Sequence, residues 1–281
     1  MRRDPPDRIE GRAGGIRAEA LLDTLPCMRL PPSFARLASM LRRTGPAAAL
    51  LAGAAMAHAD GGLLHAFQTA GDVPPPPWTV AGLPHQTKPF TQFSIVDIDG
   101  RGHRVLRVDS DNAYGNLVHP LHLDAPGLHL AWSWKVEQLV DAVDLRTREG
   151  DDTALKVCVF FDLPLQQVPF VERQVLRVAR ANTGEALPAA TVCYVWDARL
   201  AAGTTLPSAF TKRLRYKVLR SGSDHLHQWS NERRDVAADF LELFGNESTE
   251  VPPITGVAVG ADADNTHGHS LGFVSDLTLE R

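Results

Sequence analysis

The sequence predicts a mainly β protein, an antiparallel β-sandwich or jelly-roll-like domain with one late amphipathic helix. The first observation is a period-two alternation, in which one face of an extended segment carries Leu128, Leu130, Trp132, Trp134 and Val136. The second is a series of short apolar runs separated by Gly, Pro, Asp and Asn, which favour turns. The third is helical spacing of apolar residues in one segment, residues 231–244. Many strands with one helix are typical of a sandwich with that helix on an edge or an end.

Residues 61–90 are expected to be extended and irregular, because four prolines at 74–77 favour polyproline geometry over a hydrogen-bonded ladder. The alternation along 128–136 predicts a half-buried strand with Trp132 and Trp134 in the core, rather than on a surface that stacks against sugars. Trp78 and Trp229 lie in less regular segments and are expected to be freer to be exposed. The other predicted strands occupy residues 103–109, 155–161, 192–196, 214–219, 256–259 and 271–279.

The predicted helix has a clear apolar face and plausible ends. Asn231 or Asp235 is placed to cap its start, and Gly245 is placed to end it. Its apolar face is formed by Val236, Ala237, Phe240, Leu241 and Phe244.

Residues 40–59 resemble a secretory signal peptide. Arg42 and Arg43 form a positive n-region, and a short apolar run follows. The sequence Ala-His-Ala then provides the small-x-small pattern that a signal peptidase cleaves, so we expect cleavage between Ala59 and Asp60. A disordered arm followed by an Ala-rich helix is the alternative interpretation.

This segment also divides the chain. Residues 1–39 are expected to be a mis-assigned or disordered N-terminal extension, and residues 60–281 a single β-sandwich-like domain that is periplasmic or secreted. The apolar run is too short to cross a bilayer, which needs about 20 apolar residues. No cysteine directly follows the cleavage site to carry a lipid, so no membrane anchor is expected after cleavage.

The charge of the expected mature chain argues against nucleic acid as a partner. The first 59 residues hold nine of the 29 basic residues and five of the 33 acidic ones, so residues 60–281 carry a net charge of −8. Such a surface repels phosphate backbones.

Two cysteines, Cys158 and Cys193, remain after the expected cleavage, and both lie in apolar β-type runs. Thiols in an oxidising compartment tend to pair. A disulfide between neighbouring strands and two separate buried thiols both fit the sequence, because spacing alone does not show whether the side chains face each other.

The richest polar cluster runs from residue 262 to residue 269. Asp262, Asp264 and Asn265 offer alternating oxygen ligands that suit a structural calcium ion, although the spacing is not that of an EF-hand. His267 and His269 suggest zinc as an alternative. A tight turn in which Asp and Asn bond neighbouring backbone amides is the third interpretation.

Two further acidic segments are candidates for the same site. Residues 109–112 repeat the pattern Asp-x-Asp-Asn, but nothing in the sequence places the two loops together. Asp151 and Asp152 precede a predicted strand, either as solvated loop acids or as a buried pair that needs a cation. The predicted ligand-binding residues are therefore Asp151, Asp152, Asp262, Asp264 and Asn265.

The chain from Trp78 onward resembles the bacterial domain of unknown function family 3047. The matching stretches include residues 132–136, 151–155, 159–162, 194–196, 221–222, 234–236, 239–240, 244–245, 257–259 and 262–266, together with Trp229. This resemblance implies an exported β-sandwich-like domain with no assigned activity, and it supplies no catalytic residues. The Asp109–Asn112 loop departs from the small hydroxyl residues expected there, which weakens the idea of a shared two-loop site.

These observations predict an exported binding domain without catalysis, with a glycan or an envelope polymer as its ligand. A polysaccharide-active hydrolase or lyase that uses the aspartates as acid and base is the alternative from another class. A structural partner of another periplasmic protein is the third. The chain has no Gly-x-Ser-x-Gly, Gly-rich phosphate loop, His-Glu-x-x-His or Cys-x-x-Cys motif, so the familiar serine, P-loop and zincin mechanisms are not supported.

Overall fold

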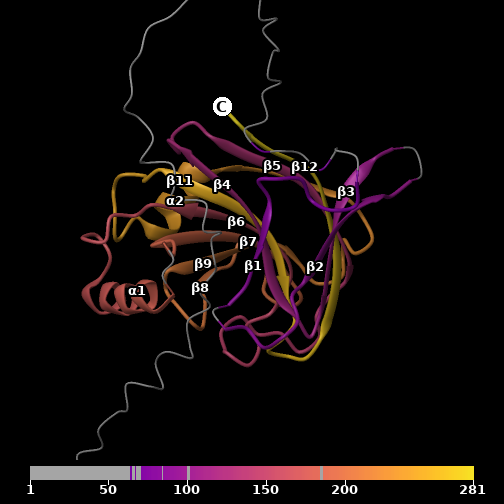
Figure 1. The fold of residues 1–281 in the computed structure, drawn as a ribbon, viewed down its shortest axis with the longest axis horizontal. Coiled ribbons are helices and arrows are strands. Elements are labelled where there is room, and N and C mark those ends of the chain that lie inside the picture. Colours follow the sequence, from indigo (N-terminus) through magenta and orange to yellow (C-terminus); the bar gives the residue numbers. More distant parts are fainter. Residues whose placement is uncertain (1–63, 65–66, 68–70, 84, 100–101, 184–185) are drawn as a thin grey trace, which may run out of the picture.

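The computed structural model describes residues 64, 67, 71–83, 85–99, 102–183 and 186–281. These residues form two β-sheets that face each other, with two helices beside them (Figure 1). The prediction of a mainly β sandwich is confirmed. The predicted signal peptide, its cleavage site and the N-terminal extension lie outside the described residues.

The larger sheet has seven strands and carries the polar site described below. All neighbouring strands pair antiparallel except β7 and β9, which are parallel. A parallel pair needs a crossover connection, and residues 198–213 provide it with the short strand β8 inside. In spatial order the strands are β1 (Thr79–Ala81), β4 (Tyr114–Leu123), β11 (Ile254–Asp262), β6 (Thr153–Phe161), β7 (Ala190–Asp197), β9 (Leu214–Ser221) and β8 (Thr205–Pro207).

The smaller sheet is antiparallel throughout and has five strands. Strand β12 is irregular, because its register against β5 shifts between Ser275 and Thr278, and Asp276 there has a φ of 54°. In spatial order the strands are β10 (Ser230–Asp235), β5 (His129–Gln138), β12 (His269–Glu280), β3 (Arg104–Asp111) and β2 (Gln92–Asp97).

The tryptophans of β5 lie in the core between the two sheets, as their alternation predicts. Trp132 and Trp134 are 2% and 0% exposed. The ring centroid of Trp132 lies 5.4 Å from that of Tyr194, and that of Trp134 lies 5.7 Å from that of Trp196, so both contact β7 across the sandwich. Burying such large rings is a dominant stabilising term in a domain of this size.

The late helix is shorter than predicted. Helix α2 spans Val236–Phe244, and Asp235 caps it by accepting hydrogen bonds from the backbone amides of Ala237 and Ala238. Asn231 is not a cap, because it lies in β10, where it pairs with Ser133 of β5. Strand pairing therefore outcompetes helix formation over the first five residues of the predicted segment.

A second helix, α1 (Phe170–Thr183), corrects the prediction of a single helix. It buries only Leu176 and Ala179, and arginines interrupt its apolar residues. So narrow an apolar stripe gives a weak periodic signal, although Pro169, directly before the helix, is a residue type common at helix starts.

The N-terminal segment corrects two further predictions. Strand β1 forms a short ladder with β4, so part of residues 61–90 is in the sheet after all. Trp78 is only 5% exposed, because its ring lies against Phe67 and His119. Strand β4 itself escaped prediction, since Gly115, Asn116 and Pro120 interrupt its apolar pattern.

Cys158 and Cys193 lie directly opposite each other on β6 and β7 and form a disulfide. Both are fully buried on the outer face of the larger sheet, in a second apolar cluster that includes Phe160, Tyr216 and Ala258. The bond closes a loop with a sequence separation of 35 residues. Such a loop corresponds to roughly 3–4 kcal/mol of stabilisation.

Candidate functional site

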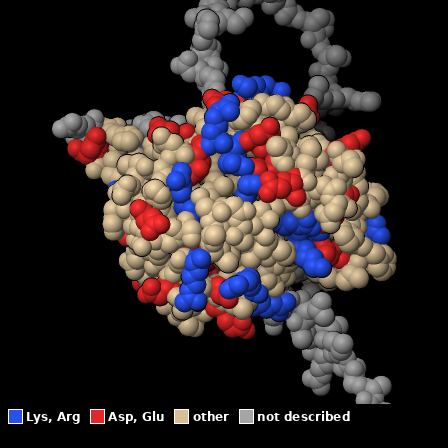
Figure 2. All heavy atoms as spheres, turned by 180° about the vertical axis from the view of Figure 1, so that it is seen from behind, with Lys and Arg blue, Asp and Glu red and all other residues tan. Residues whose placement is uncertain are grey.

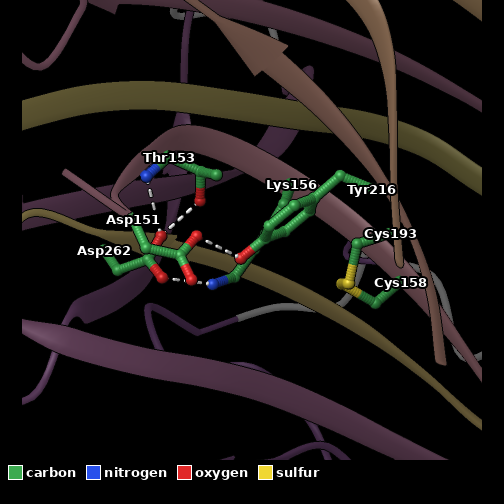
Figure 3. Close-up of a disulfide and its surroundings, with 7 residues drawn as sticks. All are labelled: Asp151, Thr153, Lys156, Cys158, Cys193, Tyr216 and Asp262. Carbon is green, nitrogen blue, oxygen red and sulfur yellow. Dashed lines mark hydrogen bonds and ion pairs between the residues drawn. A yellow bond between two sulfur atoms is a disulfide. The ribbon is translucent and has the colours of Figure 1, made fainter. Parts of the chain in front are cut away.

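Strand register brings the predicted aspartates together at one end of the larger sheet. Asp262 is the last residue of β11 and lies opposite Thr153, the first residue of the neighbouring strand β6. Asp151 and Asp152 immediately precede β6, so they arrive beside Asp262. Figure 3 shows the carboxylates of Asp151 and Asp262 side by side, close to the disulfide.

Asp262 is bonded to protein donors through both carboxylate oxygens. Its Oδ1 accepts hydrogen bonds from the backbone amide of Thr153, at 2.9 Å, and from the hydroxyl of the same residue. Its Oδ2 lies 2.7 Å from Nζ of Lys156 (Figure 3). The ammonium group of Lys156 also lies 5.3 Å from the ring centroid of Tyr114. The ion pair is buried, so the strong attraction between its charges offsets a large cost of desolvation.

Asp151 is buried beside two hydroxyl groups. Its carboxylate accepts hydrogen bonds from Ser208 Oγ at 2.7 Å and Tyr216 Oη at 2.8 Å. Burial, with the nearby charge of Asp262, raises the pKa of Asp151 to about 6 against the lowering effect of those two hydrogen bonds. Burial likewise raises the pKa of Tyr216 well above its usual value, so this phenol remains a hydrogen-bond donor.

Asp152 fixes the turn between β11 and β12. Its Oδ1 accepts from the backbone amide of Asn265 at 3.2 Å and from its Nδ2 at 3.1 Å. Its Oδ2 accepts from the amide and the hydroxyl of Thr266, both at 2.7 Å. Burial raises the pKa of Asp152. Asp151 and Asp152 are 3% and 0% exposed, so the interpretation as solvated loop acids is wrong.

Asp264 differs from the other three aspartates. Its Oδ1 is buried and has no hydrogen-bond partner among the described residues. Burial, together with the charges of Asp262 and Asp152, raises the pKa of Asp264 to about 6. Its backbone carbonyl accepts a hydrogen bond of 3.1 Å from Nζ of Lys88.

The two Asp-x-Asp-Asn loops, which the sequence alone could not place, meet at this end of the sandwich. The backbone amide of Asn112 donates to the carbonyl of Gly268 at 2.8 Å. The Asn112 Oδ1 lies 2.9 Å from Nδ1 of His267, and Asp109 Oδ1 lies 2.7 Å from Nε2 of His269. These contacts hold the β3–β4 and β11–β12 turns against each other.

The groups that surround the aspartates are poorly suited to the binding of a calcium ion. Within the described ranges, no three His, Cys, Asp or Glu side chains are grouped to hold a metal ion. Asp262 is already neutralised by Lys156, and the side-chain amide of Asn265 donates to Asp152. A calcium ion at Asp262, Asp264 and Asn265 would have to displace these contacts.

Four further side chains complete this network and were not predicted from the sequence: Lys156, Tyr216, Ser208 and Thr153. A signal existed for Lys156, because a lysine within the apolar strand Thr153–Phe161 needs an acidic partner if that strand is buried. The other three are common residue types without a distinctive spacing.

A second candidate surface lies on the solvent face of the smaller sheet. Trp229 is 37% exposed, which confirms its predicted freedom. The ammonium group of Lys135 lies 5.7 Å from its ring centroid and 5.0 Å from that of Phe273. The ring of His103 lies 6.4 Å from that of Trp229. Lys135 also forms a 2.5 Å ion pair with Glu137.

Charges of both signs are interspersed over the molecular face drawn in Figure 2, around an uncharged area. None of the helices that the structure describes is long and apolar enough to span a membrane.

No curated protein matches the chain. A family described as "Protein of unknown function (DUF3047)" matches residues 76–278, which include both sheets and both helices. The chain therefore belongs to the DUF3047 family.

Proposed function

We propose that this DUF3047 domain is an exported, non-catalytic binding domain for a glycan or another cell-envelope polymer. In this proposal the ligand lies on the solvent face of the five-stranded sheet. The observation that carries the proposal is the exposed ring of Trp229 beside Lys135 on that face.

The chemistry of this face suits a sugar. A pyranose ring has an apolar C–H surface, which stacks on a flat aromatic ring, and hydroxyl groups at its edge that need hydrogen-bond partners. Phe273 pairs with Lys135 on one side and with Arg107 on the other, so one row of the sheet alternates aromatic and cationic groups. Ser133 and Asn231, which are hydrogen-bonded to each other at 2.7 Å, add polar groups in neighbouring strands.

The proposed location is supported by the disulfide. Cys158 and Cys193 are joined between neighbouring strands, and such bonds persist mainly in oxidising compartments. This agrees with the signal-like sequence at residues 40–59.

The burial and the hydrogen bonds of the acidic cluster support the proposal that the domain is not catalytic. Asp151, Asp152 and Asp262 are each less than 5% exposed, and protein donors already occupy both oxygens of each carboxylate. A catalytic carboxylate has to reach its substrate, whereas these groups hold the turns together.

One observation favours the alternative of a polysaccharide-active enzyme. The pKa values of Asp151 and Asp264 are both raised to about 6, as is typical of a general acid that works near neutral pH. Asp264→Asn separates the two functions. It should abolish the release of sugar fragments if the domain is an enzyme, and it should leave binding unchanged if the domain only binds.

A glycan array, followed by affinity measurements on the glycans that bind, tests the proposal. Trp229→Ala should weaken binding by about tenfold or more, as is usual for a central aromatic contact. Phe90→Ala is the matched control, because Phe90 is 44% exposed and its ring lies next to Gly82, which directly follows β1 of the other sheet. Equal affinity of wild type and Trp229→Ala, or failure to bind any glycan or isolated envelope polymer, would refute the proposed function.

A further inference from the structure

Helix α1 concentrates exposed apolar side chains in one place. Phe170, Val171 and Val178 are 67%, 71% and 49% exposed, and they make up three of the eight large hydrophobic side chains that are exposed in the described part of the chain. Figure 1 shows α1 at the periphery of the molecule, away from the space between the two sheets. The proposed glycan surface does not use this helix.

The sequence of α1 places apolar and basic residues in two stripes. Val171, Val175 and Val178 follow one another at i, i+4 and i+7, and Arg173, Arg177 and Arg180 repeat the same spacing. With 3.6 residues per turn, the two stripes lie on either side of Phe170 on the outward side of the helix. The buried residues Leu176 and Ala179 lie on the opposite side.

The outward side of α1 is basic, whereas the expected mature chain is acidic. Residues 163–183 contain one acidic residue, Glu172, and its carboxylate is paired with Arg213 of the adjoining sheet. Arg180 is directed to the protein, because its Nε donates to the carbonyl of Leu187 at 3.0 Å. Arg177 is exposed, and Arg173 is half-buried, with its guanidinium 5.6 Å from the ring centroid of Phe170. These two arginines are therefore the cations on the outward side of the helix.

We infer that this face of α1 docks on an anionic lipid surface, with Phe170 and the valines in the interfacial region and Arg173 and Arg177 at the lipid phosphates. Peripheral helices of this kind combine a few inserted apolar side chains with electrostatic attraction to acidic lipids. The inference goes beyond the proposed function, since it assigns the domain a place at the membrane surface.

The size of the patch favours a lipid surface over a protein. A stable protein interface buries about 800 Å² on each partner. One face of a 14-residue helix that ends in Ala181, Asn182 and Thr183 offers little of that area. A bilayer needs no matching shape, so a small amphipathic face is enough for reversible binding.

Vesicle co-sedimentation of the purified protein tests the inference. The protein should bind vesicles that contain phosphatidylglycerol more tightly than vesicles of pure phosphatidylcholine, and added salt should weaken this binding. Arg173→Gln and Arg177→Gln should each reduce the partition coefficient roughly fivefold. Phe170→Ser/Val171→Ser should also reduce it, without a change in melting temperature, because both side chains are exposed.

The matched controls are Arg146→Gln and Val73→Ser. Arg146 has a side chain 67% exposed and pairs with Asp144 in the loop that precedes β6, whereas α1 follows β6. Val73 is 76% exposed and follows Asp72, whose carbonyl accepts a hydrogen bond from Ile95 of β2 in the smaller sheet. They should bind as the wild type does. The inference is overturned if the α1 variants bind vesicles as tightly as these controls, or if vesicles of both lipid compositions bind equally well. It is also overturned if the helix face binds an acidic protein but does not bind vesicles.

Discussion

Nζ of Lys156 lies 2.7 Å from Oδ2 of Asp262, and the two side chains are only 2% and 5% exposed. This buried ion pair joins β6 to β11 in the middle of the acidic cluster, and it balances the charge of one of the four aspartates that gather at this end of the larger sheet. It also makes the cluster a structural element, because removal of either charge leaves the other one buried without a partner.

Lys156→Met should therefore lower the free energy of unfolding by about 3–5 kcal/mol. Urea denaturation at neutral pH measures this change. Lys156→Met/Asp262→Asn should recover part of the loss, since the double variant buries no unpaired charge. A single variant as stable as the wild type would show that the pair is not buried in solution.

The pH dependence of stability tests the environment of Asp151. Its pKa is raised from 3.8 to about 6 on folding, so the native state binds more protons than the unfolded state between these values. The contribution of Asp151 is therefore fully present below about pH 4 and is lost as the pH rises through 6. The loss is on the order of 3 kcal/mol.

Asp151→Asn removes this titration. Its stability relative to the wild type should increase as the pH is raised from 4 to 7, as measured by urea unfolding at each pH. A difference that stays constant across this range would contradict the raised pKa.

The disulfide should contribute measurably to stability. Cys158→Ala/Cys193→Ala should lower the free energy of unfolding by roughly 3–4 kcal/mol, because the unfolded chain loses a closed loop. Thermal unfolding with and without reductant checks this. Reductant should lower the unfolding temperature of the wild type and leave that of the double variant unchanged. An unfolding temperature of the wild type that does not change with reductant would count against the bond.

The calcium expectation can be tested by chelation. Since Lys156 neutralises Asp262, and backbone amides already donate hydrogen bonds to both oxygens of Asp152, EDTA should leave the melting temperature unchanged. Elemental analysis of the wild type and of Asp262→Ala/Asp264→Ala provides the control. Stoichiometric calcium in the wild type that is lost in the variant would restore the calcium site.

Export has a separate test. Mass spectrometry of the protein released from cells should find an N-terminus at Asp60. Retention of the uncleaved chain in the cytoplasm would refute both the signal peptide and the proposed location.

Local periodicity was sufficient to predict much of the fold. The alternation of Trp132 and Trp134 correctly placed both rings in the core, and Asp235 was correctly among the candidate caps of α2. Local sequence signals gave wrong predictions where a residue contacts partners that are distant in the sequence. Trp78 is buried by His119, and β10 takes residues that otherwise resemble the start of a helix because β5 is available for pairing.

The candidate site, too, could be predicted from local sequence signals only where it does not depend on distant partners. Residue types alone identified Asp151, Asp152, Asp262 and Asp264, but not their burial, because their partners lie up to 176 residues away. The surface around Trp229 could not be predicted either. It depends on Lys135 of β5, whose ammonium group lies over the ring of Trp229 and also over the ring of Phe273 in β12.

The most direct test of the central claim is the affinity of wild type and Trp229→Ala for a glycan identified by the array, measured by calorimetric titration. The account predicts saturable binding to the wild type and a loss of affinity of about tenfold or more for the variant, with an unchanged melting temperature. Equal affinities would show that the solvent face of the five-stranded sheet is not the binding surface.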